Sequence, residues 1–177
     1  MYEDILHFWF EEARPEQWWR KDSEFDRRIV ARFQEVHAKA CRCELFAWRD
    51  NARGRLAEII VLDQFSRNMY RESALAFAND TLALVLAQEA VHVNADRSLG
   101  DVERSFLYMP FMHSESLVIH EKAVELFTRN GIASNLDFEM QHKAVIEQFG
   151  RYPHRNRSLG RESTPAEIEF MEQNPGF

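Results

Sequence analysis

The sequence predicts an all-α protein, and three observations lead to this fold class. The 177 residues include only six glycines and five prolines, which fall between long stretches of helix-forming residues. No segment alternates apolar and polar residues for long enough to indicate a strand. Hydrophobic residues make up 45% of the chain, which is enough for one core. We therefore expect a single domain over residues 1–177, an antiparallel array of about seven to eight helices resembling a tetratricopeptide-like superhelix.

The N-terminal part of the chain is expected to form two helices joined by an apolar turn. The first covers Glu3–Glu11, and the turn follows at Pro15. Asp22 or Ser23 can cap the second helix, in which apolar residues recur at intervals of three or four over Phe25–Ala40. This spacing predicts an amphipathic helix with one face in the core.

Three further elements are expected in the middle of the chain. Leu56–Phe65 is apolar on almost every face, which indicates a helix buried among others. A fourth helix should run from about Ser73 to Val93. The next begins at Asp101, and Pro110 should break or kink it because proline lacks the amide proton and clashes one turn back. The bend is expected to expose His113-Ser114-Glu115.

Glycine, proline and capping residues also mark the ends of the C-terminal helices. These residues divide the rest of the chain into helices and loops. The expected elements, in order, are a helix that ends near Asn130 with Gly131 as its stop, a helix from Ser134 or Asn135 to Phe149-Gly150, a polar loop over residues 151–157, and a last helix that opens with the capping box Thr164-Pro165-Ala166-Glu167 and ends at Asn174-Pro175-Gly176.

Composition excludes several classes of partner and location. The 22 basic and 29 acidic residues give a net charge of −7, so we expect neither a nucleic-acid surface nor an anionic-membrane surface. The longest uninterrupted apolar run, Leu82–Ala87, is far shorter than the ~20 residues of a transmembrane helix. The first residues are acidic where a secretory signal is basic, which predicts a cytoplasmic protein. Cys41 and Cys43 point apart on a helix, which suits neither a disulfide nor a chelate.

A pair of opposite charges lies at the C-terminal end of the most buried predicted helix. Asp63 lies on a face that is otherwise apolar, and Arg67 follows four residues later on the same face. A buried carboxylate is normally paired, so the two can form a structural ion pair. Alternatively, Arg67 points into a pocket and receives an anionic ligand.

Four histidines lie in elements that could converge. His120 and His142 interrupt apolar helical faces, His113 follows the Pro110 bend, and His154 lies in the loop after residue 150. Each can be a core histidine that donates to a carbonyl or carboxylate. Because imidazole titrates near neutral pH, each can equally act as an acid, a base or a metal ligand.

The loop Arg151–Arg161 is the sharpest local charge reversal in this acidic chain. It contains four arginines and one histidine before its first acidic residue. A guanidinium group fits a carboxylate or phosphate, so the loop indicates an anion site. In the structural alternative, Arg151 and Arg155 cap the carbonyls of the preceding helix and pair with Glu103 or Glu115.

Two Glu-x-x-His pairs, Glu89–His92 and Glu139–His142, suggest a weaker metal hypothesis. Di-iron four-helix bundles use this pair twice, together with one glutamate from each of two other helices. Glu35 and Glu121 are the residues available for that role. The chain has no Gly-x-Ser-x-Gly elbow, and neither cysteine has a histidine at a diagnostic spacing, so a nucleophilic hydrolase is disfavoured further.

Three longer segments resemble a known family. They are Leu62–Asn68, Glu103–Glu115, and Phe149–Asn156 with Leu159-Gly160-Arg161 and Ser163-Thr164 shortly after it. Together they are similar to the signature of the bacterial family called domain of unknown function 924, over nearly the whole chain. The resemblance implies an all-helical array related to tetratricopeptide folds and supplies no established substrate, cofactor or catalytic residue. The polar motif positions are Asp63, Arg67, Asn68, Glu103, Arg104, His113, Glu115, Arg151, His154, Arg155 and Asn156.

These residues support four hypotheses. The first is a binding module whose pocket forms where the Asp63 helix, the Pro110 bend and the Arg151 loop meet, and whose ligand is a small anion or a peptide carboxylate. The second is an acid–base or hydrolytic enzyme that uses His113, Glu115 and His154. The third is a metal protein that uses Glu89, His92, Glu139 and His142, although the sequence by itself predicts no cofactor. In the fourth, the polar residues form a salt-bridge network that fixes helix packing. The predicted ligand-binding residues are Asp63, Arg67, Asn68, Glu103, Arg104, Arg151, Arg155 and Asn156.

Overall fold

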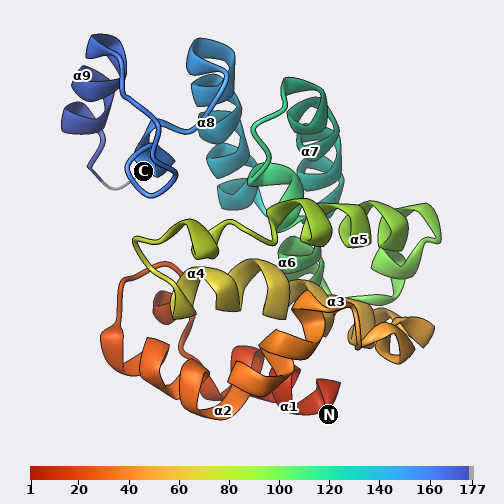
Figure 1. Ribbon diagram of the computed structural model, residues 1–177. Helices are drawn as coiled ribbons and strands as arrows, with labels where there is room; N and C mark the ends of the chain where they lie inside the picture. The colour runs from red at the N-terminus through yellow and green to blue at the C-terminus, as the bar shows by residue number, and fades with distance from the viewer. Residues whose placement is uncertain (176–177) are drawn as a thin grey trace.

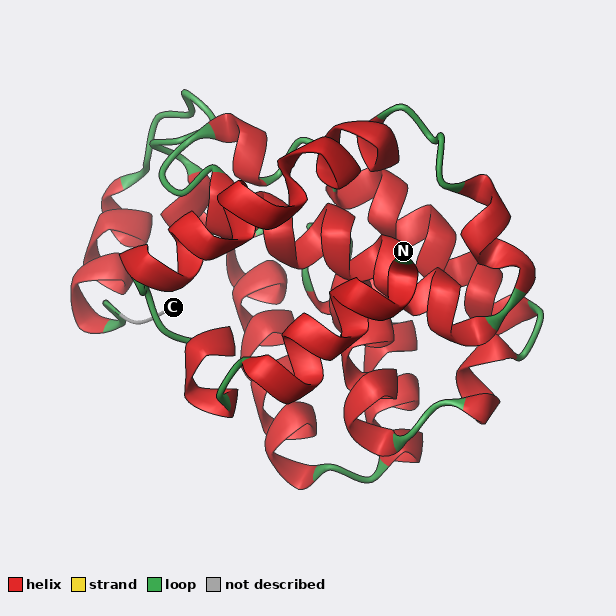
Figure 2. Cartoon of the chain, turned by 90° about the horizontal axis from the view of Figure 1, so that it is seen from below, coloured by secondary structure: helices red, strands yellow, loops and turns green. Residues whose placement is uncertain are grey.

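The computed structural model describes residues 1–175, which form only helices and the loops between them (Figures 1 and 2). A π-helical turn, Val61–Phe65, joins α3 to α4 without a break, so these residues form eight continuous α-helices. The all-α prediction and the predicted number of helices are therefore confirmed. The α-helical segments are α1 Tyr2–His7, α2 Ser23–Cys41, α3 Ala52–Ile60, α4 Ser66–Met69, α5 Asp80–His92, α6 Asp101–Met112, α7 Leu117–Asn130, α8 Ala133–Phe149 and α9 Pro165–Gln173.

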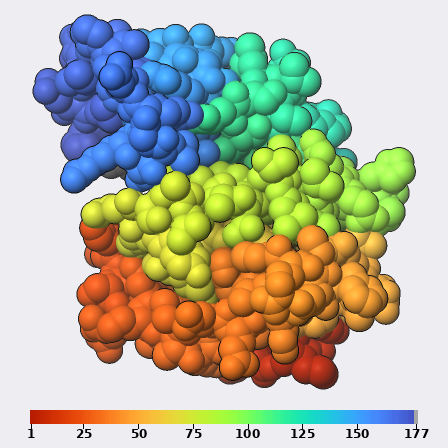
Figure 3. All heavy atoms as spheres, viewed as in Figure 1, coloured from red at the N-terminus to blue at the C-terminus, as the bar shows by residue number. Residues whose placement is uncertain are grey.

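The helices are arranged in three tiers (Figure 1). In that view α1 and α2 lie at the bottom, the continuous helix of α3 and α4 crosses the middle together with α5, and α7, α8 and α9 stand at the top. The space-filling view shows the same order as bands of colour from the N-terminus to the C-terminus (Figure 3). Because α6 contacts α3, α5, α7 and α8, it connects the tiers.

Two hydrophobic cores of unequal size hold these tiers together. The larger one extends from α1 to α7 and contains a cluster of aromatic rings, in which Phe8 stacks on Phe25 with ring centroids 5.4 Å apart. The smaller one consists of Val145, Ile146 and Tyr152, with α9 packed against it. The candidate site described below lies where the C-terminal end of α6 and the helix α8 meet the first core.

Most of the predicted helix ends are confirmed. Asp22 caps α2 by accepting hydrogen bonds from two backbone amides of the first turn. Gly131 and Gly150 follow α7 and α8 with φ angles of +83° and +69°, a conformation that glycine adopts without steric cost. The Thr164 capping box opens α9, which ends at Gln173. Gly176, which we expected to help end this helix, lies outside the described residues.

Three predictions about the middle of the chain are wrong in detail. The helix expected from Ser73 begins at Asp80, because the Ser73 side chain accepts from a backbone amide of a separate 3-10 turn. Pro110 lies inside α6 and does not break it; α6 continues to Met112, since one bond lost in the last turn is tolerated. The segment after Pro110 is not fully exposed either, because only 15% of the His113 side chain is accessible.

One segment, Ala74–His92, is long and apolar enough to span a membrane by length and composition alone. Scattered polar residues divide this segment, so it contains no long uninterrupted apolar run. Packed helices of globular cores meet the same criterion. Within this segment, α5 buries Ala83, Leu86, Ala87 and Ala90 in the larger core and packs against α3 and α6.

Candidate active site

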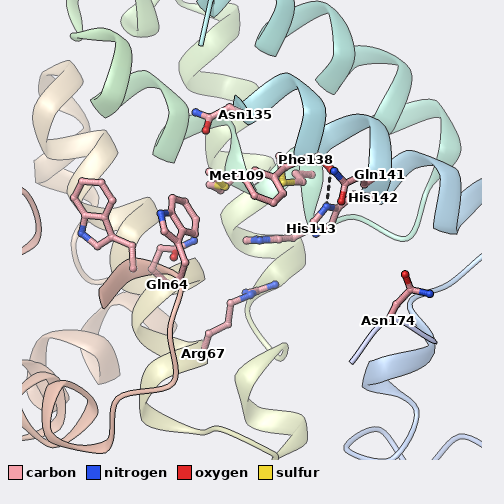
Figure 4. Close-up of a pocket in the computed structure, with 12 residues that line it drawn as sticks. Gln64, Arg67, Met109, His113, Asn135, Phe138, Gln141, His142 and Asn174 are labelled. Atoms are coloured by element: carbon pink, nitrogen blue, oxygen red, sulfur yellow. Dashed lines mark hydrogen bonds between the residues drawn. The ribbon is translucent and has the colours of Figure 1, made fainter. Parts of the chain in front are cut away.

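A pocket of about 580 Å³ opens between the Trp18-Trp19 turn, the end of α6 and one face of α8. Figure 4 shows Gln64 and Arg67 approaching this space from one side and Asn135, Phe138 and Gln141 of α8 from the other. Apolar and polar groups both contribute to its wall. The lining residues are Trp18, Trp19, Gln64, Arg67, Met109, Met112, His113, Asn135, Phe138, Gln141, His142 and Asn174.

Phe106 of α6 holds the aromatic wall of the pocket in place. Trp18 packs edge-on against Phe106 with ring centroids 5.0 Å apart, and Trp19 stacks on the same ring at 5.8 Å. The indole nitrogen of Trp18 donates to the carbonyl oxygen of Trp9, which fixes the turn further. Trp19 nevertheless remains 60% exposed, so much of its ring faces the pocket or solvent.

Asp63 forms the polar floor beneath the pocket. It lies in the π-helical turn and is completely buried. Its carboxylate accepts hydrogen bonds from Gln64 Nε2 at 2.6 Å, His113 Nδ1 at 2.7 Å and Arg67 Nη1 at 3.2 Å. Burial by itself would raise the pKa of Asp63, but the charge of Arg67 and the contacts from His113 and Gln64 outweigh it and hold this pKa below its usual value. Asp63 is therefore an ionised acceptor.

His113 connects this floor to the pocket. It follows α6 directly, and its Nδ1 donates to Asp63 while its ring lines the pocket. Burial and the nearby charge of Arg67 lower the pKa of His113, so the ring is neutral at neutral pH. With the proton on Nδ1, the second nitrogen Nε2 carries a lone pair. No group within residues 1–175 forms a hydrogen bond with this Nε2.

A second carboxylate, Asp80, binds two arginines next to Asp63 and His113. Arg67 donates to both Asp80 oxygens, at 2.8 and 3.0 Å. Arg155 donates to Asp80 at 3.2 Å and to the backbone oxygen of His113 at 2.9 Å. Two carboxylates and two guanidinium groups thus alternate in this network, and their charges sum to zero. The four residues are Asp63, Arg67, Asp80 and Arg155. The two guanidinium groups are engaged with carboxylates of the same chain.

Other predicted site residues lie away from the pocket. Asn68 donates to Asp26 of α2. Arg104 donates to backbone oxygens of the turn before α6 and to Asn130 of α7, while Glu103 pairs with Arg53. These residues therefore tie helices together and do not face the candidate ligand.

The arginine-rich loop also has partners other than those we predicted. Arg151 pairs with Glu167 of α9, at 2.7 and 2.9 Å, and Glu115 pairs with Arg161, also at 2.7 and 2.9 Å. The predicted pairing of Arg151 and Arg155 with Glu103 or Glu115 is therefore wrong. Asn156 is buried and bonds to residues of its own loop and of α9.

The three predicted catalytic residues contact different partners. Glu115 is engaged by Arg161 and by the backbone amide of Tyr152. His154 packs against the Tyr152 ring, and burial lowers the pKa of His154 to about 4. Of the three, only His113 lines the pocket, and its carboxylate partner is Asp63.

The residues of the metal hypothesis are similarly dispersed. Glu89 pairs with Arg55, Glu139 pairs with His120, and His142 donates through Nδ1 to the Phe138 carbonyl oxygen. Within the described part of the chain, no three His, Cys, Asp or Glu side chains are grouped as metal ligands are. His120 is instead a fully buried histidine with partners on both ring nitrogens.

Several lining residues were not predicted from the sequence. Gln64 is the most important because it shares the carboxylate of Asp63 with His113. A signal for it existed, since Gln64 is a second polar residue within the buried segment Leu62–Phe65. Trp18, Asn135 and Gln141 gave no comparable signal, because only the packing of α8 against the first core brings them to one pocket.

The fold and the site together define an all-helical protein with an aspartate–histidine pair at the floor of a pocket. The chain belongs to the family described as bacterial protein of unknown function, DUF924, whose sequence model matches residues 5–175. It is also similar to a solved structure of a protein of unknown function from Agrobacterium tumefaciens, with 38% identity and a TM-score of 0.92, covering 98% of this chain and 97% of that one. No protein of curated function matches the chain. The family resemblance read from the sequence is confirmed.

Proposed function

We propose that the protein is an enzyme of the acid–base type in which His113 is the general base and Asp63 positions it. The observation that supports this proposal is the hydrogen bond of 2.7 Å from His113 Nδ1 to Asp63, on a ring whose second nitrogen has no bonded partner within residues 1–175 and which lines the pocket. This is the second hypothesis from the sequence, with Asp63 in place of Glu115.

The physical basis is the difference between the two ring nitrogens. Asp63 accepts the Nδ1 proton and so fixes the tautomer in which Nε2 can take a proton from water or from a substrate. The imidazolium that then forms is stabilised by the adjacent carboxylate. Because the pKa of His113 is lowered, the basic form is the populated one at neutral pH.

The binding-module hypothesis receives less support from this geometry. An anion or a peptide carboxylate at Arg67 or Arg155 would have to displace Asp80, which already bonds to both. Arg104 and Arg151 face other partners. We keep three further predictions within the proposal: a cytoplasmic location, a tetratricopeptide-like superhelix, and the absence of nucleic-acid and membrane partners.

The test measures turnover in two reaction types that need only a base. The first is hydrolysis of p-nitrophenyl carboxylate esters, and the second is exchange of α-hydrogens of simple ketones in D₂O, followed by NMR. We expect at least one rate to fall ~10²–10⁴-fold in His113→Gln, the usual contribution of a general base. We also expect a loss in Asp63→Asn, and a pH profile that rises through one ionisation below 6.5.

The matched control is His92→Gln, since His92 is an exposed histidine at the end of α5 outside the pocket. Its rate should equal that of the wild type. If neither reaction in the wild type exceeds the rate of His113→Gln, the proposed role of His113 is wrong.

A further inference from the structure

Asp63 orients two pocket residues at once. One oxygen accepts from His113 Nδ1 and the other from Gln64 Nε2, at 2.7 and 2.6 Å. The one N–H of the neutral His113 ring and one of the two N–H groups of Gln64 Nε2 donate to this carboxylate. Each side chain also has an acceptor that it can present to the pocket: Nε2 of His113 and Oε1 of Gln64.

Neither acceptor has a hydrogen-bond partner among the described residues. Within residues 1–175, no hydrogen bond reaches Gln64 Oε1 or His113 Nε2, although both residues line the pocket. Figure 4 shows the two side chains bordering the same space. A ligand in the pocket can therefore satisfy both acceptors only by donating two hydrogen bonds.

The charges around this floor favour a neutral ligand. The positive charges of Arg67 and Arg155 are balanced by Asp63 and Asp80, as described above. An anionic group placed on the floor would face two lone pairs and would have no unpaired guanidinium group to compensate. A carboxylate ligand is thus disfavoured by the same contacts that orient His113.

The walls favour an aromatic ligand. Trp19 and Phe138 are 60% and 55% exposed, and Met109, Met112 and Trp18 complete the apolar part of the lining. Indole and phenyl rings bind planar rings by offset stacking or edge-to-face contact, and methionine sulfur adapts to ring edges. Apolar walls above a floor with two acceptors match a flat molecule with donors on one edge.

We propose that the pocket takes a neutral aromatic molecule with two neighbouring O–H or N–H donors, of which an aromatic diol is the simplest. This inference rests on the proposed function and names its substrate class. In the reactive complex, one O–H bond breaks, its electron pair stays on the oxygen, and the proton forms an N–H bond at His113 Nε2. Gln64 Oε1 accepts a hydrogen bond from the second donor of the ligand and so holds the ligand ring in the orientation in which its first O–H group points at His113 Nε2.

The experiment is calorimetric titration of the wild-type protein with catechol, resorcinol, their dimethyl ethers and benzoate. We expect at least one diol to bind 10-fold or more tightly than its dimethyl ether, since a site built around hydrogen bonds rejects an analogue that lacks the donors. Benzoate should bind more weakly than that diol. On binding, the ¹⁵N resonance of His113 Nε2 should move in the direction of a hydrogen-bonded acceptor.

Gln64→Met removes one acceptor and keeps the apolar volume, so it should reduce the preference for the diol over its ether. The matched control is Gln88→Met, which changes an exposed glutamine of α5 outside this pocket. The proposal is overturned if the ethers or benzoate bind as tightly as both diols, or if Gln64→Met leaves the preference unchanged.

The two proposals fail in different ways. If a diol binds selectively but no substrate is turned over, the proposal that the protein is an enzyme is wrong and the proposed ligand class is supported. If turnover depends on His113 but ligands with donors are not preferred, the proposed ligand class is wrong and the proposed enzyme is supported.

Discussion

The protein contains two histidine–carboxylate pairs with the same contact distance and different surroundings. His113 Nδ1 lies 2.7 Å from Asp63, and His120 Nδ1 lies 2.7 Å from Glu139. The second pair is fully buried, and its other ring nitrogen lies 2.8 Å from the Ser114 carbonyl oxygen. In the first pair, the other ring nitrogen has no bonded partner within residues 1–175 and the ring lines the pocket.

The comparison teaches that the pairing alone does not indicate a catalytic site. Asp63 receives three donors, and its pKa lies below the usual value. Glu139 receives one, its Oε2 is buried without a hydrogen bond from any described residue, and burial raises the pKa of Glu139. The first pair is therefore a charged acceptor with an oriented base, whereas the second is a closed contact that joins α7 to α8.

The largest effect on stability is expected when the buried pair of His120 and Glu139 loses one partner. Glu139→Leu leaves His120 buried with one ring nitrogen unpaired, and we expect the free energy of unfolding to fall by about 3–5 kcal/mol, as for other buried pairs that lose one partner. His113→Gln should cost less, about 1 kcal/mol, because this side chain borders the pocket and water can reach it. Urea unfolding followed by circular dichroism measures both.

The double variant His120→Leu/Glu139→Leu is the control for this experiment. Removing both polar groups should recover part of the loss, since neither is then left unpaired. Equal losses in Glu139→Leu and His113→Gln would contradict the distinction between the two pairs.

The sequence predicted the local part of the site and missed the part that depends on packing. The pairing of Asp63 with Arg67 follows from a separation of four residues on one helix, and the contact exists. The bond between Asp63 and His113 joins residues 50 positions apart and depends on how α6 packs against the π-helical turn. In an ordinary α-helix, neighbouring side chains diverge by about 100°, so nothing predicted that Gln64 would share its neighbour's carboxylate.

The charge pattern misled for a related reason. The loop Arg151–Arg161 looked like an anion site because four arginines and one histidine precede its first acidic residue. Their partners come from distant parts of the chain: Glu167 for Arg151, Asp80 for Arg155 and Glu115 for Arg161. A count along the sequence cannot register acids that the fold supplies from other helices.

The next effect in size uses pH to sharpen the comparison. Burial lowers the pKa of His113, lowers that of His142 to about 3 and lowers that of His154 to about 4. The pKa of a histidine in the unfolded chain is ~6.5. Below this pH the unfolded state binds more protons than the folded state, so the free energy of unfolding falls as the pH falls. From pH 6.5 to 5.5 we expect a loss of about 1–3 kcal/mol for the three histidines together.

Urea unfolding at a series of pH values measures this slope. His142→Gln should flatten it by removing one of the protons that the unfolded chain takes up. The depressed pKa of Asp63 adds a further loss only below about pH 3.8, where the unfolded carboxyl becomes protonated. If the free energy of unfolding does not change between pH 6.5 and 5.5, these histidines have the same pKa in the folded and unfolded states, and the prediction is wrong.

The smallest expected effect concerns Arg151, the residue on which the anion-site hypothesis from the sequence depended. Its side chain is 29% exposed and ties the loop to α9 through Glu167, so Arg151→Ala should lower the free energy of unfolding by less than Glu139→Leu does, because water partly solvates this ion pair. Because Arg151 does not line the pocket, the affinity for a diol should equal that of the wild type in the same titration. A complete loss of ligand binding with unchanged stability would instead move the ligand site from the Asp63–His113 floor to the arginine loop.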